Sequence, residues 1–394
     1  MWSLKRAVTH LWLSSQSAAR VGRIHTPHGV MDTPGFVPVA TSGTVKGCDN
    51  LRLMEAGSQL IFCNTYHFLV HPGPKVVEDA GGLHKFINYK TGPIITDSGG
   101  FQIFSMSARK ITNELKGKIP SKYECEIQTH RYLFDESNSA SLISLNEKGA
   151  TFRSYYDGEL ITLTPESSVM AQKQLGSDII IPLDILPSID NQDMMATFHR
   201  THRWQERSLQ THKADPRGQA MYSVIHGGMD ISLRNKSMDT LFEMPFDGHA
   251  VGGSIGSNRT ESFDLLKAIM PRLTSTHKPV HLLGVGDTQS IGSMIGFGID
   301  TFDSSYPTKI ARTGRLLSEG GTIDISRSEF KSSHDEPIDR TCGCVACKNH
   351  SRAFLHHLNR MSELSFYTLA TAHNVWKMND YMRSLREKIT RNEL

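Results

Sequence analysis

Eight short apolar runs recur along the 394-residue chain, and most of them end in a polar residue or a glycine. Apolar runs of this length, bounded by turn residues, are typical of strands buried inside a sheet. Neighbouring runs lie too far apart for hairpins, and their spacing suits the crossover connections that join parallel strands. The predicted strands cover residues 35–40, 60–64, 94–97, 178–184, 221–227, 249–253, 280–286 and 299–303.

Helical segments separate most of these runs. Thr164 and Pro165 have the order of a helix start, with a capping threonine and a proline at the first helical position, and Gly176 follows the predicted end. Two further helices are expected over residues 191–212 and 264–270. Eight strands alternating with helices favour a (β/α)8 TIM barrel, of the α/β class, over an open sheet.

In such a barrel the carboxyl ends of the strands meet at one rim, where barrel enzymes keep their catalytic residues. Three carboxylates among the predicted strand ends indicate catalysis, because unpaired acids on a structural surface would repel one another. Asp97 is followed by two glycines, which let the backbone turn sharply beside a ligand. A plainer alternative is that the Asp97 carboxylate caps the N-terminus of the next helix and has no catalytic role. The rim residues are Asn64, Asp97, Asp184, His226, Gly252, Gly253, residues 284–286 and Asp303.

Three of the six cysteines, Cys342, Cys344 and Cys347, form a C-x-C-x-x-C cluster, and the others are scattered. Three thiolates and one imidazole suit tetrahedral Zn²⁺ and leave no position for water, so one structural zinc per chain is predicted. The candidates for the fourth ligand are His350, His356, His357 and His373. The alternatives are a chance cluster of free cysteines, and an iron–sulfur cluster, which would need a fourth cysteine nearby. The pattern indicates metal binding rather than disulfides, and hence a reducing compartment.

The chain is expected to consist of three parts. Residues 1–20 would be an N-terminal extension; they lack acids, as transit peptides do, but the core is expected to begin almost directly after them. Residues 21–330 would form the barrel core, with a polar insertion at about 108–148 that is too long for an ordinary loop. Residues 331–394 would supply the zinc-binding segment and C-terminal helices that complete the barrel.

Composition narrows the possible partners. No apolar run approaches the ~20 residues of a membrane helix, so no membrane partner is expected and a cytoplasmic location is predicted. The net charge is +3, but residues 305–394 carry 14 basic and 10 acidic side chains. A mildly basic C-terminal quarter is compatible with an anionic polymer as partner.

Several ordered motifs run through the chain besides the cysteine cluster. They lie at residues 28–29 (HG), 33–39 (TPGFVPV), 64–67 (NTYH), 81–84 (GGLH), 96–102 (TDSGGFQ), 251–253 (VGG), 284–286 (GVG), 302–303 (FD), 307–308 (PT) and 351–353 (SRA). In these motifs the chain resembles tRNA-guanine transglycosylases, also called queuine tRNA-ribosyltransferases, over roughly residues 20–390. So many motifs in one order make coincidence implausible.

The resemblance implies a (β/α)8 barrel with a C-terminal zinc-binding insert that acts on the anticodon loop of tRNA. Such enzymes exchange guanine at the wobble position for a 7-deazaguanine base. By the same resemblance Asp303 looks like the nucleophile at ribose C1′, Asp97 like the acid/base, and Asp184 like a reader of the purine edge. The zinc ligands would be Cys342, Cys344, Cys347 and His373. Two displacements at one carbon would retain its configuration, as in retaining glycosidases.

The resemblance also implies two sets of contacts. The residues expected to bind the base are Asp97, Ser98, Gly99, Gly100, Phe101, Gln102, Asp184, His226, Gly227, Gly253, Ser254 and Leu283. Those expected near the RNA are Gly284, Val285, Gly286, Asp287, Thr308, Lys309, Ile310, Ala311 and Arg312. Arg315, Lys348 and Arg352 are further candidates for phosphate contacts. A homodimer is expected, with a heterodimer as the alternative.

Departures from the family pattern concern the identity of the incoming base. Gly227 and Gly256 stand where a branch using the small aminomethyl-deazaguanine precursor (preQ1) usually has Gln and Val, and Asn258 stands where it has Glu. The two glycines should enlarge the pocket and the lost carboxylate should weaken binding of the precursor, so queuine is the predicted base. If the side chains of His226 and Ser254 fill the space left by the two glycines, the precursor would be favoured instead.

Two other classes of protein fit the sequence less well. A non-catalytic RNA-binding subunit is disfavoured because both Asp97 and Asp303 are present. A metal-dependent barrel hydrolase would need several ligands at the rim around an open coordination position, and only His226 and His67 lie near it.

Overall fold

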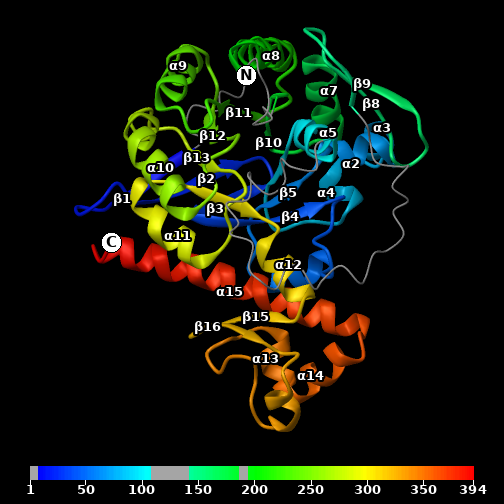
Figure 1. Ribbon diagram of the computed structural model, residues 1–394, viewed down its shortest axis with the longest axis vertical. Coiled ribbons are helices and arrows are strands. Elements are labelled where there is room, and N and C mark those ends of the chain that lie inside the picture. Colours follow the sequence, from blue (N-terminus) through cyan, green and yellow to red (C-terminus); the bar gives the residue numbers. More distant parts are fainter. Residues whose placement is uncertain (1–7, 108–141, 186–193) are drawn as a thin grey trace. The chain divides into compact units, whose positions relative to one another are not determined.

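The computed structural model describes residues 8–107, 142–185 and 194–394 (Figure 1). Most of the predicted insertion at about 108–148 lies outside these residues, and so does the predicted start of a helix at residue 191. The last part of the insertion, Leu142–Leu145, is strand β7.

Eight parallel strands close into a barrel, and this confirms the predicted (β/α)8 architecture. Their order around the barrel is β10-β11-β12-β13-β14-β4-β5-β6. The strands are β4 (Gly35–Thr41), β5 (Ile61–Cys63), β6 (Ile94–Thr96), β10 (Ile179–Ile180), β11 (Ala220–Ile225), β12 (Gly248–Val251), β13 (Val280–Leu282) and β14 (Thr301–Ser304).

Each predicted run overlaps one barrel strand, but several strands are shorter than expected. The strand predicted over residues 178–184 is reduced to Ile179–Ile180. Beyond it, the side chain of Gln172 replaces a neighbouring strand, because Ile181 N–H donates to Gln172 Oε1 (3.0 Å) and Gln172 Nε2 donates to Ile181 O (2.8 Å). The Gln172 side chain therefore forms the hydrogen bonds that the backbone of Ile181 would otherwise make to a neighbouring strand. The residues after Ile181 can then leave the sheet and lie at the rim of the barrel.

The predicted helix start at Thr164 is confirmed. Thr164 accepts a hydrogen bond from Ser167 N–H, Pro165 occupies the first turn of α7 (Pro165–Leu175), and Gly176 ends the helix with a φ of +67°. The other predicted helices are longer or shifted. They are α8 (Met194–Ala214) and α10 (Arg259–Thr274).

The chain divides into two compact units. The first contains Asn64–Gly82 and Thr96–Val280; the second contains Leu83–Ile95, His281–Leu394 and the described part of Lys5–Cys63. Besides α7, α8 and α10, the described residues of the first unit form the helices α2 (Thr65–Val70), α3 (Pro74–Asp79), α5 (Gly100–Ser107) and α9 (Ile231–Phe242). Those of the second are α1 (Asn50–Glu55), α4 (Leu83–Phe86), α11 (Thr288–Met294), α12 (Tyr306–Arg312), α13 (Val345–Asn349), α14 (Arg352–Arg360) and α15 (Leu364–Thr390), with short 3-10 helices at Ile295–Phe297 and Ser328–Ser332.

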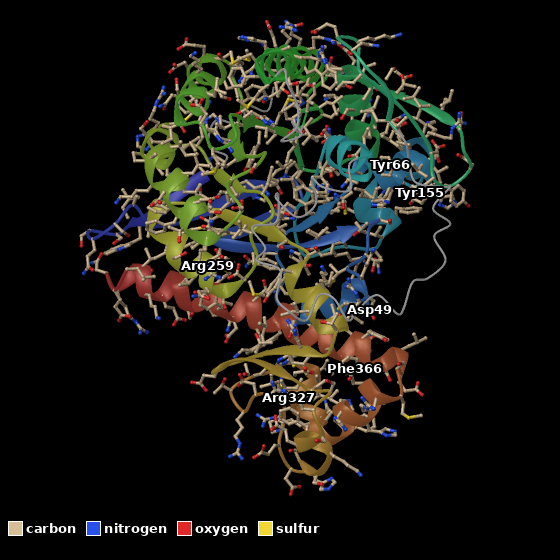
Figure 2. All side chains as sticks on the ribbon, in the orientation of Figure 1. Asp49, Tyr66, Tyr155, Arg259, Arg327 and Phe366 are labelled. Atoms are coloured by element: carbon tan, nitrogen blue, oxygen red, sulfur yellow. The ribbon has the colours of Figure 1, made fainter. Side chains whose placement is uncertain are left out.

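In the first unit, an antiparallel sheet of β7, β8 (Ala150–Arg153) and β9 (Leu160–Leu163) shares a buried apolar cluster with α2, α5 and α8. Trp204 from α8 is fully buried there and donates its indole N–H to Glu147 O at 2.9 Å. Tyr66 stacks on Tyr155 with ring centroids 6.0 Å apart, and Figure 2 labels both side chains. These contacts hold α2, which begins directly after Asn64.

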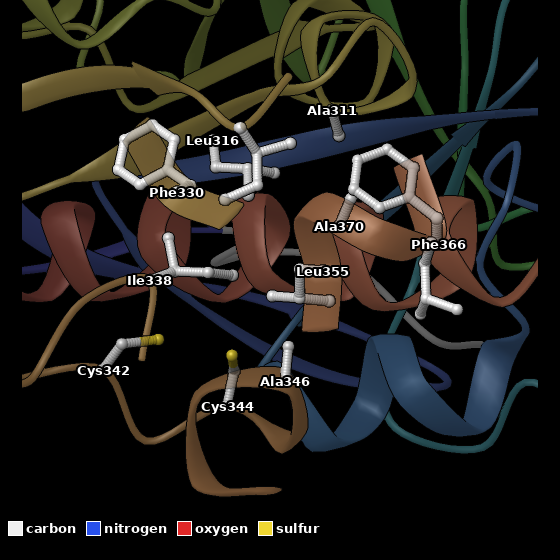
Figure 3. Close-up of a cluster of buried hydrophobic side chains, with 12 residues drawn as sticks. Ala311, Leu316, Phe330, Ile338, Cys342, Cys344, Ala346, Leu355, Phe366 and Ala370 are labelled. Carbon is white, nitrogen blue, oxygen red and sulfur yellow. The ribbon is translucent and has the colours of Figure 1, made fainter. Parts of the chain in front are cut away.

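In the second unit, the 27-residue helix α15 packs against α12, α13, β4 and β15 (Arg315–Ser318), which pairs with β16 (Gly321–Asp324). A second apolar cluster contains residues from α12, α13, α14, α15 and β15 (Figure 3). An N-terminal sheet of β1 (Val8–Leu13), β2 (Arg20–Thr26) and β3 (Gly29–Thr33) belongs to the same unit. Among the helices of the described ranges, none is long and apolar enough to cross a membrane.

Candidate active site

Asp97 follows directly after strand β6, and its side chain is buried. Its carboxylate accepts four hydrogen bonds. Oδ1 accepts from the backbone N–H groups of Thr65 (2.8 Å) and Gly99 (3.1 Å), and Oδ2 from the amides of Asn64 (2.6 Å) and Gln102 (3.2 Å). Only one backbone donor comes from the turn before α5, so capping of that helix does not explain the position of Asp97.

Burial raises the pKa of Asp97 to about 6, because removing the ionised carboxylate from water costs more than its hydrogen bonds return. The four donors act in the opposite direction and lower the pKa. A carboxyl group that titrates close to neutral pH can both give and take a proton under ordinary conditions. Asp97 therefore has the property required of a general acid/base.

Two glycines make the turn after Asp97 possible. Gly99 has a φ of +84°, a left-handed conformation that other residues rarely adopt. An added Cβ at Gly100 would lie 2.8 Å from the carbonyl oxygen of Asp184. A residue with a side chain would thus separate the start of α5 from the segment that follows β10.

Asp184 lies at the centre of a polar cluster built from four strand ends. Its Oδ2 lies 2.9 Å from His226 Nε2, and its Oδ1 accepts a hydrogen bond from Ser98 Oγ at 3.4 Å. Gly253, with a φ of +72°, is so close that an added Cβ would lie 3.4 Å from His226 Nδ1. The structure therefore brings together four of the predicted base contacts. Their donors and acceptors suit the polar edge of a purine.

Arg234 supports this cluster, and no sequence motif pointed to it. It is fully buried on α9, and its guanidinium group donates to the carbonyl oxygens of Ile225 (2.5 Å), Gly228 (2.9 Å), Gly252 (2.8 Å) and Ser254 (2.9 Å). One side chain thus holds the turns after β11 and β12, which carry His226 and Gly253. The only possible signal was a charged residue on the buried face of a helix.

Two glycines that were predicted to enlarge the base pocket have a different role. Gly227 has a φ of +143°, and an added Cβ would lie 2.6 Å from Arg234 N on α9. Gly256 has a φ of +110°, and an added Cβ would lie 2.6 Å from Glu261 Cβ. The prediction that these glycines remove side-chain atoms from a pocket wall is wrong, because side chains there would meet helix atoms and strain the backbone.

The loop around Asn258 has a carboxylate that the expected loss at position 258 did not take into account. Asn258 caps helix α10 and accepts a hydrogen bond from Glu261 N–H at 3.0 Å. Glu261 in turn accepts hydrogen bonds from Asn258 Nδ2 (2.8 Å) and from Ser257 N–H (2.7 Å). The loop therefore still contains a carboxylate, three residues further along the chain.

Asp303 lies on β14 in the second unit, and 7% of its surface is exposed. Its Oδ1 accepts a hydrogen bond from Gly284 N–H at 3.1 Å and lies 3.1 Å from His281 Nε2. The nearby Asp300 is fully buried and makes an ion pair with Arg20 at 2.5 Å. This pairing leaves Asp300 a structural role.

The remaining predicted residues occupy varied positions. Phe101 is 38% exposed, and Leu283 is half-buried directly after β13. Of the residues predicted to lie near RNA, Thr308, Ile310 and Ala311 are buried on α12, whereas Lys309 is exposed and Arg312 is half-buried. Asp287 caps α11, and Gly286 is packed against Ser304. The guanidinium group of Arg352 donates hydrogen bonds to Glu336 Oε2 (3.0 Å) and Ile338 O (3.0 Å). Lys348 and Arg315, in contrast, are exposed.

A second site lies in the second unit, where the three clustered cysteines surround one histidine. His373 Nδ1 lies 3.5 Å from Cys342 Sγ and 3.4 Å from the Sγ atoms of Cys344 and Cys347. A tetrahedral zinc, with bonds of about 2.3 Å to sulfur and 2.0–2.1 Å to nitrogen, would hold these atom types about 3.6 Å apart. The four side chains therefore fit a metal ion.

The surroundings of His373 select the nitrogen that would bind the metal. Its Nε2 donates a hydrogen bond to Leu317 O at 2.6 Å, which leaves Nδ1 free of a proton and directed at the thiols. His356, one of the other candidates, instead bonds Ile325 O through Nδ1 at 2.8 Å. Cys342 and Cys344 also belong to the apolar cluster around Phe330, as Figure 3 shows. A metal here would connect the cysteine segment to α15.

Comparison with known proteins agrees with these features. The family model described as queuine tRNA-ribosyltransferase matches residues 15–133 and 121–394. A queuine tRNA-ribosyltransferase of Protochlamydia amoebophila is 48% identical over 378 residues, which are 95% of this chain and 93% of that protein. Proteins of the same name from Chlamydia pneumoniae and Chlamydia abortus are 45% and 46% identical, over 97% and 98% of both chains respectively.

These matches extend over nearly the whole chain and include the strand ends and the cysteine cluster. The chain belongs to the queuine tRNA-ribosyltransferase family, and it is a pentosyltransferase.

Proposed function

We propose that this enzyme exchanges guanine at the wobble position (34) of a tRNA anticodon for a 7-deazaguanine base, through a covalent enzyme–tRNA intermediate. The observation that carries the proposal is the buried Asp97, whose pKa is raised by burial to about 6, near polar groups that complement the edge of a purine. The names of the relatives support tRNA as the substrate.

The reaction would proceed by two displacements at ribose C1′. In the first, an Asp303 carboxylate oxygen bonds to C1′ while the bond from C1′ to guanine N9 breaks, and the departing base takes a proton from Asp97. In the second, the incoming base loses a proton to Asp97, its N9 bonds to C1′, and the Asp303 ester bond breaks. Asp97 thus ends in its original protonation state, and the configuration at C1′ is retained.

The polar cluster would select the base. The carboxylate of Asp184 can accept hydrogen bonds from the N1–H and 2-amino groups that guanine and 7-deazaguanines share. His226, whose Nε2 contacts Asp184 Oδ2, would hold that carboxylate in place, and the groups near Gly253 would face the remaining polar positions. Because the target base must leave the stack of the anticodon loop, it would bind in a swung-out form.

Queuine is the proposed incoming base, and its support is the name shared by the relatives. The aminomethyl precursor is the second candidate, favoured by the Glu261 carboxylate beside Asn258, which could balance its ammonium group. Gly256→Val would not distinguish the two bases, since it strains the loop itself. Competition between the two bases for guanine-labelled tRNA would distinguish them.

Zinc is the proposed metal of the Cys342, Cys344, Cys347 and His373 site. When bound it would supply a structural link with no coordination position left for water. The exposed Lys309, Arg315 and Lys348 are proposed phosphate contacts, and a homodimer is the proposed assembly.

The test is a guanine-exchange assay with bulk tRNA and purified protein. We expect labelled guanine to be incorporated into tRNA and to be released again when queuine is added. We also expect a complex with tRNA that survives denaturation in the absence of free base. A protein that binds tRNA but neither exchanges guanine nor forms this complex would be the non-catalytic subunit instead.

A further inference from the structure

A buried histidine contacts the proposed nucleophile. His281, on β13, has no exposed surface, and its Nε2 lies 3.1 Å from Asp303 Oδ1. Its Nδ1 lies 2.8 Å from the hydroxyl oxygen of Thr301, and its ring is stacked parallel to Phe62 at 6.1 Å between centroids. Both polar atoms of the ring and one face are thus occupied, so its orientation is determined by the barrel itself.

These contacts assign the protons. A carboxylate only accepts hydrogen bonds, so Nε2 must carry the proton that points to Asp303. In the neutral ring Nδ1 is then an acceptor, and the Thr301 hydroxyl donates to it. One tautomer satisfies both contacts, in a chain that runs from Thr301 through His281 to Asp303.

The two carboxylate oxygens of Asp303 are therefore unequal. Oδ1 accepts from His281 Nε2–H and from Gly284 N–H, both at 3.1 Å. Within the described part of the chain, Oδ2 accepts no hydrogen bond, and the side chain is 9% exposed. An oxygen with free lone pairs is the better nucleophile, so the geometry distinguishes the attacking atom.

We propose that Asp303 attacks ribose C1′ through Oδ2, and that His281 is a positioning residue that holds Oδ1. This rests on the proposed function. As the bond between Oδ2 and C1′ forms and the bond to guanine N9 breaks, Oδ1 becomes the carbonyl oxygen of a glycosyl ester. When the ester breaks, its electron pair returns to the carboxylate, and the two N–H donors stabilise the restored charge.

The two donors to Asp303 should affect the stability of the covalent adduct, which a merely structural role of His281 would not do. The donors bind the free carboxylate more strongly than the less charged ester oxygen, so they favour the free enzyme over the covalent adduct. Removal of one donor should therefore shift the equilibrium toward the adduct. Damage to the fold would instead reduce the amount of adduct.

The experiment compares His281→Leu, which removes the donor at similar volume, with His281→Gln, which can place an amide N–H near the same point. Full-length protein is incubated with tRNA, guanine is titrated in, and the adduct that survives denaturation is quantified. For His281→Leu we expect at least a 10-fold lower kcat with an unchanged KM for tRNA, and about 10-fold more guanine needed to clear half of the adduct. His281→Gln should restore most of both values.

Thr301→Val removes only the hydroxyl that orients the ring, and it should give a smaller change in the same direction. It also serves as the test if His281→Leu fails to fold. The proposal is overturned if the folded variants clear the adduct at the guanine concentration of the unmodified enzyme, or if Gln and Leu are equally impaired. If the unmodified enzyme forms no adduct and exchanges no guanine, it is the proposed function that fails.

Discussion

The surroundings of Asp97 and of Asp303 differ in a way that matches two kinds of chemistry. Both oxygens of Asp97 accept hydrogen bonds from four donors, and burial nevertheless raises its pKa to about 6. At Asp303 one oxygen is held by two donors, and the other accepts none from the described residues. The first arrangement suits a group that exchanges protons, and the second suits a group that forms a bond to carbon.

The chemistry of a strand-end carboxylate is therefore determined by its hydrogen-bond donors and not by its position on the strand. Both aspartates stand at carboxyl ends of barrel strands, where the sequence pattern treats them alike. The donors to Asp97 include Asn64 and Thr65, whereas those to Asp303 come from β13 and the turn after it. Substitutions at the two sites should therefore have different effects.

Loss of the nucleophile should have the largest effect. We expect Asp303→Asn to reduce guanine exchange by at least about 10³-fold and to abolish the denaturation-resistant adduct, while tRNA binding persists. Asp97→Asn should also stop turnover, but because Asp303 remains, slow adduct formation should still be detectable. Electrophoresis of denatured reactions and a filter-binding assay measure these quantities. Near-normal exchange by Asp303→Asn would place the nucleophile elsewhere.

Loss of the metal site should act on stability rather than on either carboxylate. Cys344→Ala should abolish binding of about one zinc per chain and lower the free energy of unfolding by more than about 4 kcal/mol, because His373 and the cysteine segment lose their link. Metal analysis and thermal denaturation measure both. Cys48→Ala, at a buried cysteine of the same unit outside the cluster, is the control and should retain the metal. Folded Cys344→Ala with its full zinc content would contradict the assignment.

Loss of Arg234 should affect binding of the base and leave the nucleophile Asp303 unchanged. Arg234→Met removes the donors to four carbonyl groups of the turns that carry His226 and Gly253. Because hydrogen bonds from a charged group contribute about 1.5–3 kcal/mol, we expect the KM for the free base to rise roughly 10- to 100-fold, and Arg234→Lys to recover part of this. Lys236→Ala, at an exposed position of the same helix, should change the KM by less than about twofold. If all three variants had the KM of the unmodified enzyme, the hydrogen bonds from Arg234 to the two turns would not be needed for base binding.

The smallest expected effect is a shift in pH dependence. The donors around Asp97 favour its ionised form, so removing one raises its pKa. Asn64→Leu should therefore move the acidic limb of the exchange profile from about pH 6 to higher pH, by about one unit. Profiles of kcat/KM for the incoming base measure it. A limb that stays in place, or moves to lower pH, would show that another group controls it.

The same pKa has a consequence for stability. Since the pKa of Asp97 is raised above its ordinary value of 3.8, the protonated form favours folding. Its stabilising contribution is fully present below about pH 3.8 and is lost as the pH rises through about 6. Asp97→Asn cannot ionise, so the stability of this variant should fall less over that range than that of the unmodified enzyme.

Much of the architecture was predictable because it depends on local patterns. Short apolar runs predicted eight strands, and their alternation with helices predicted a barrel that the structure confirms. The capped start at Thr164 and the cysteine spacing are likewise local features. Strand lengths were less predictable, because Gln172 pairs with Ile181 and ends β10 early.

The sequence by itself determined the fold class, the family, the two strand-end carboxylates and the three metal-binding thiols, because each is encoded in the order of neighbouring residues. Only the tertiary structure decided what surrounds them. It brought His373, the fourth ligand that the family resemblance implied, within reach of the cysteines. It also placed Arg234 across two turns and His281 against Asp303, and turned Gly227 and Gly256 toward helix atoms. Such contacts join residues far apart in sequence, and their geometry depends on how strands and helices pack, which no local pattern records.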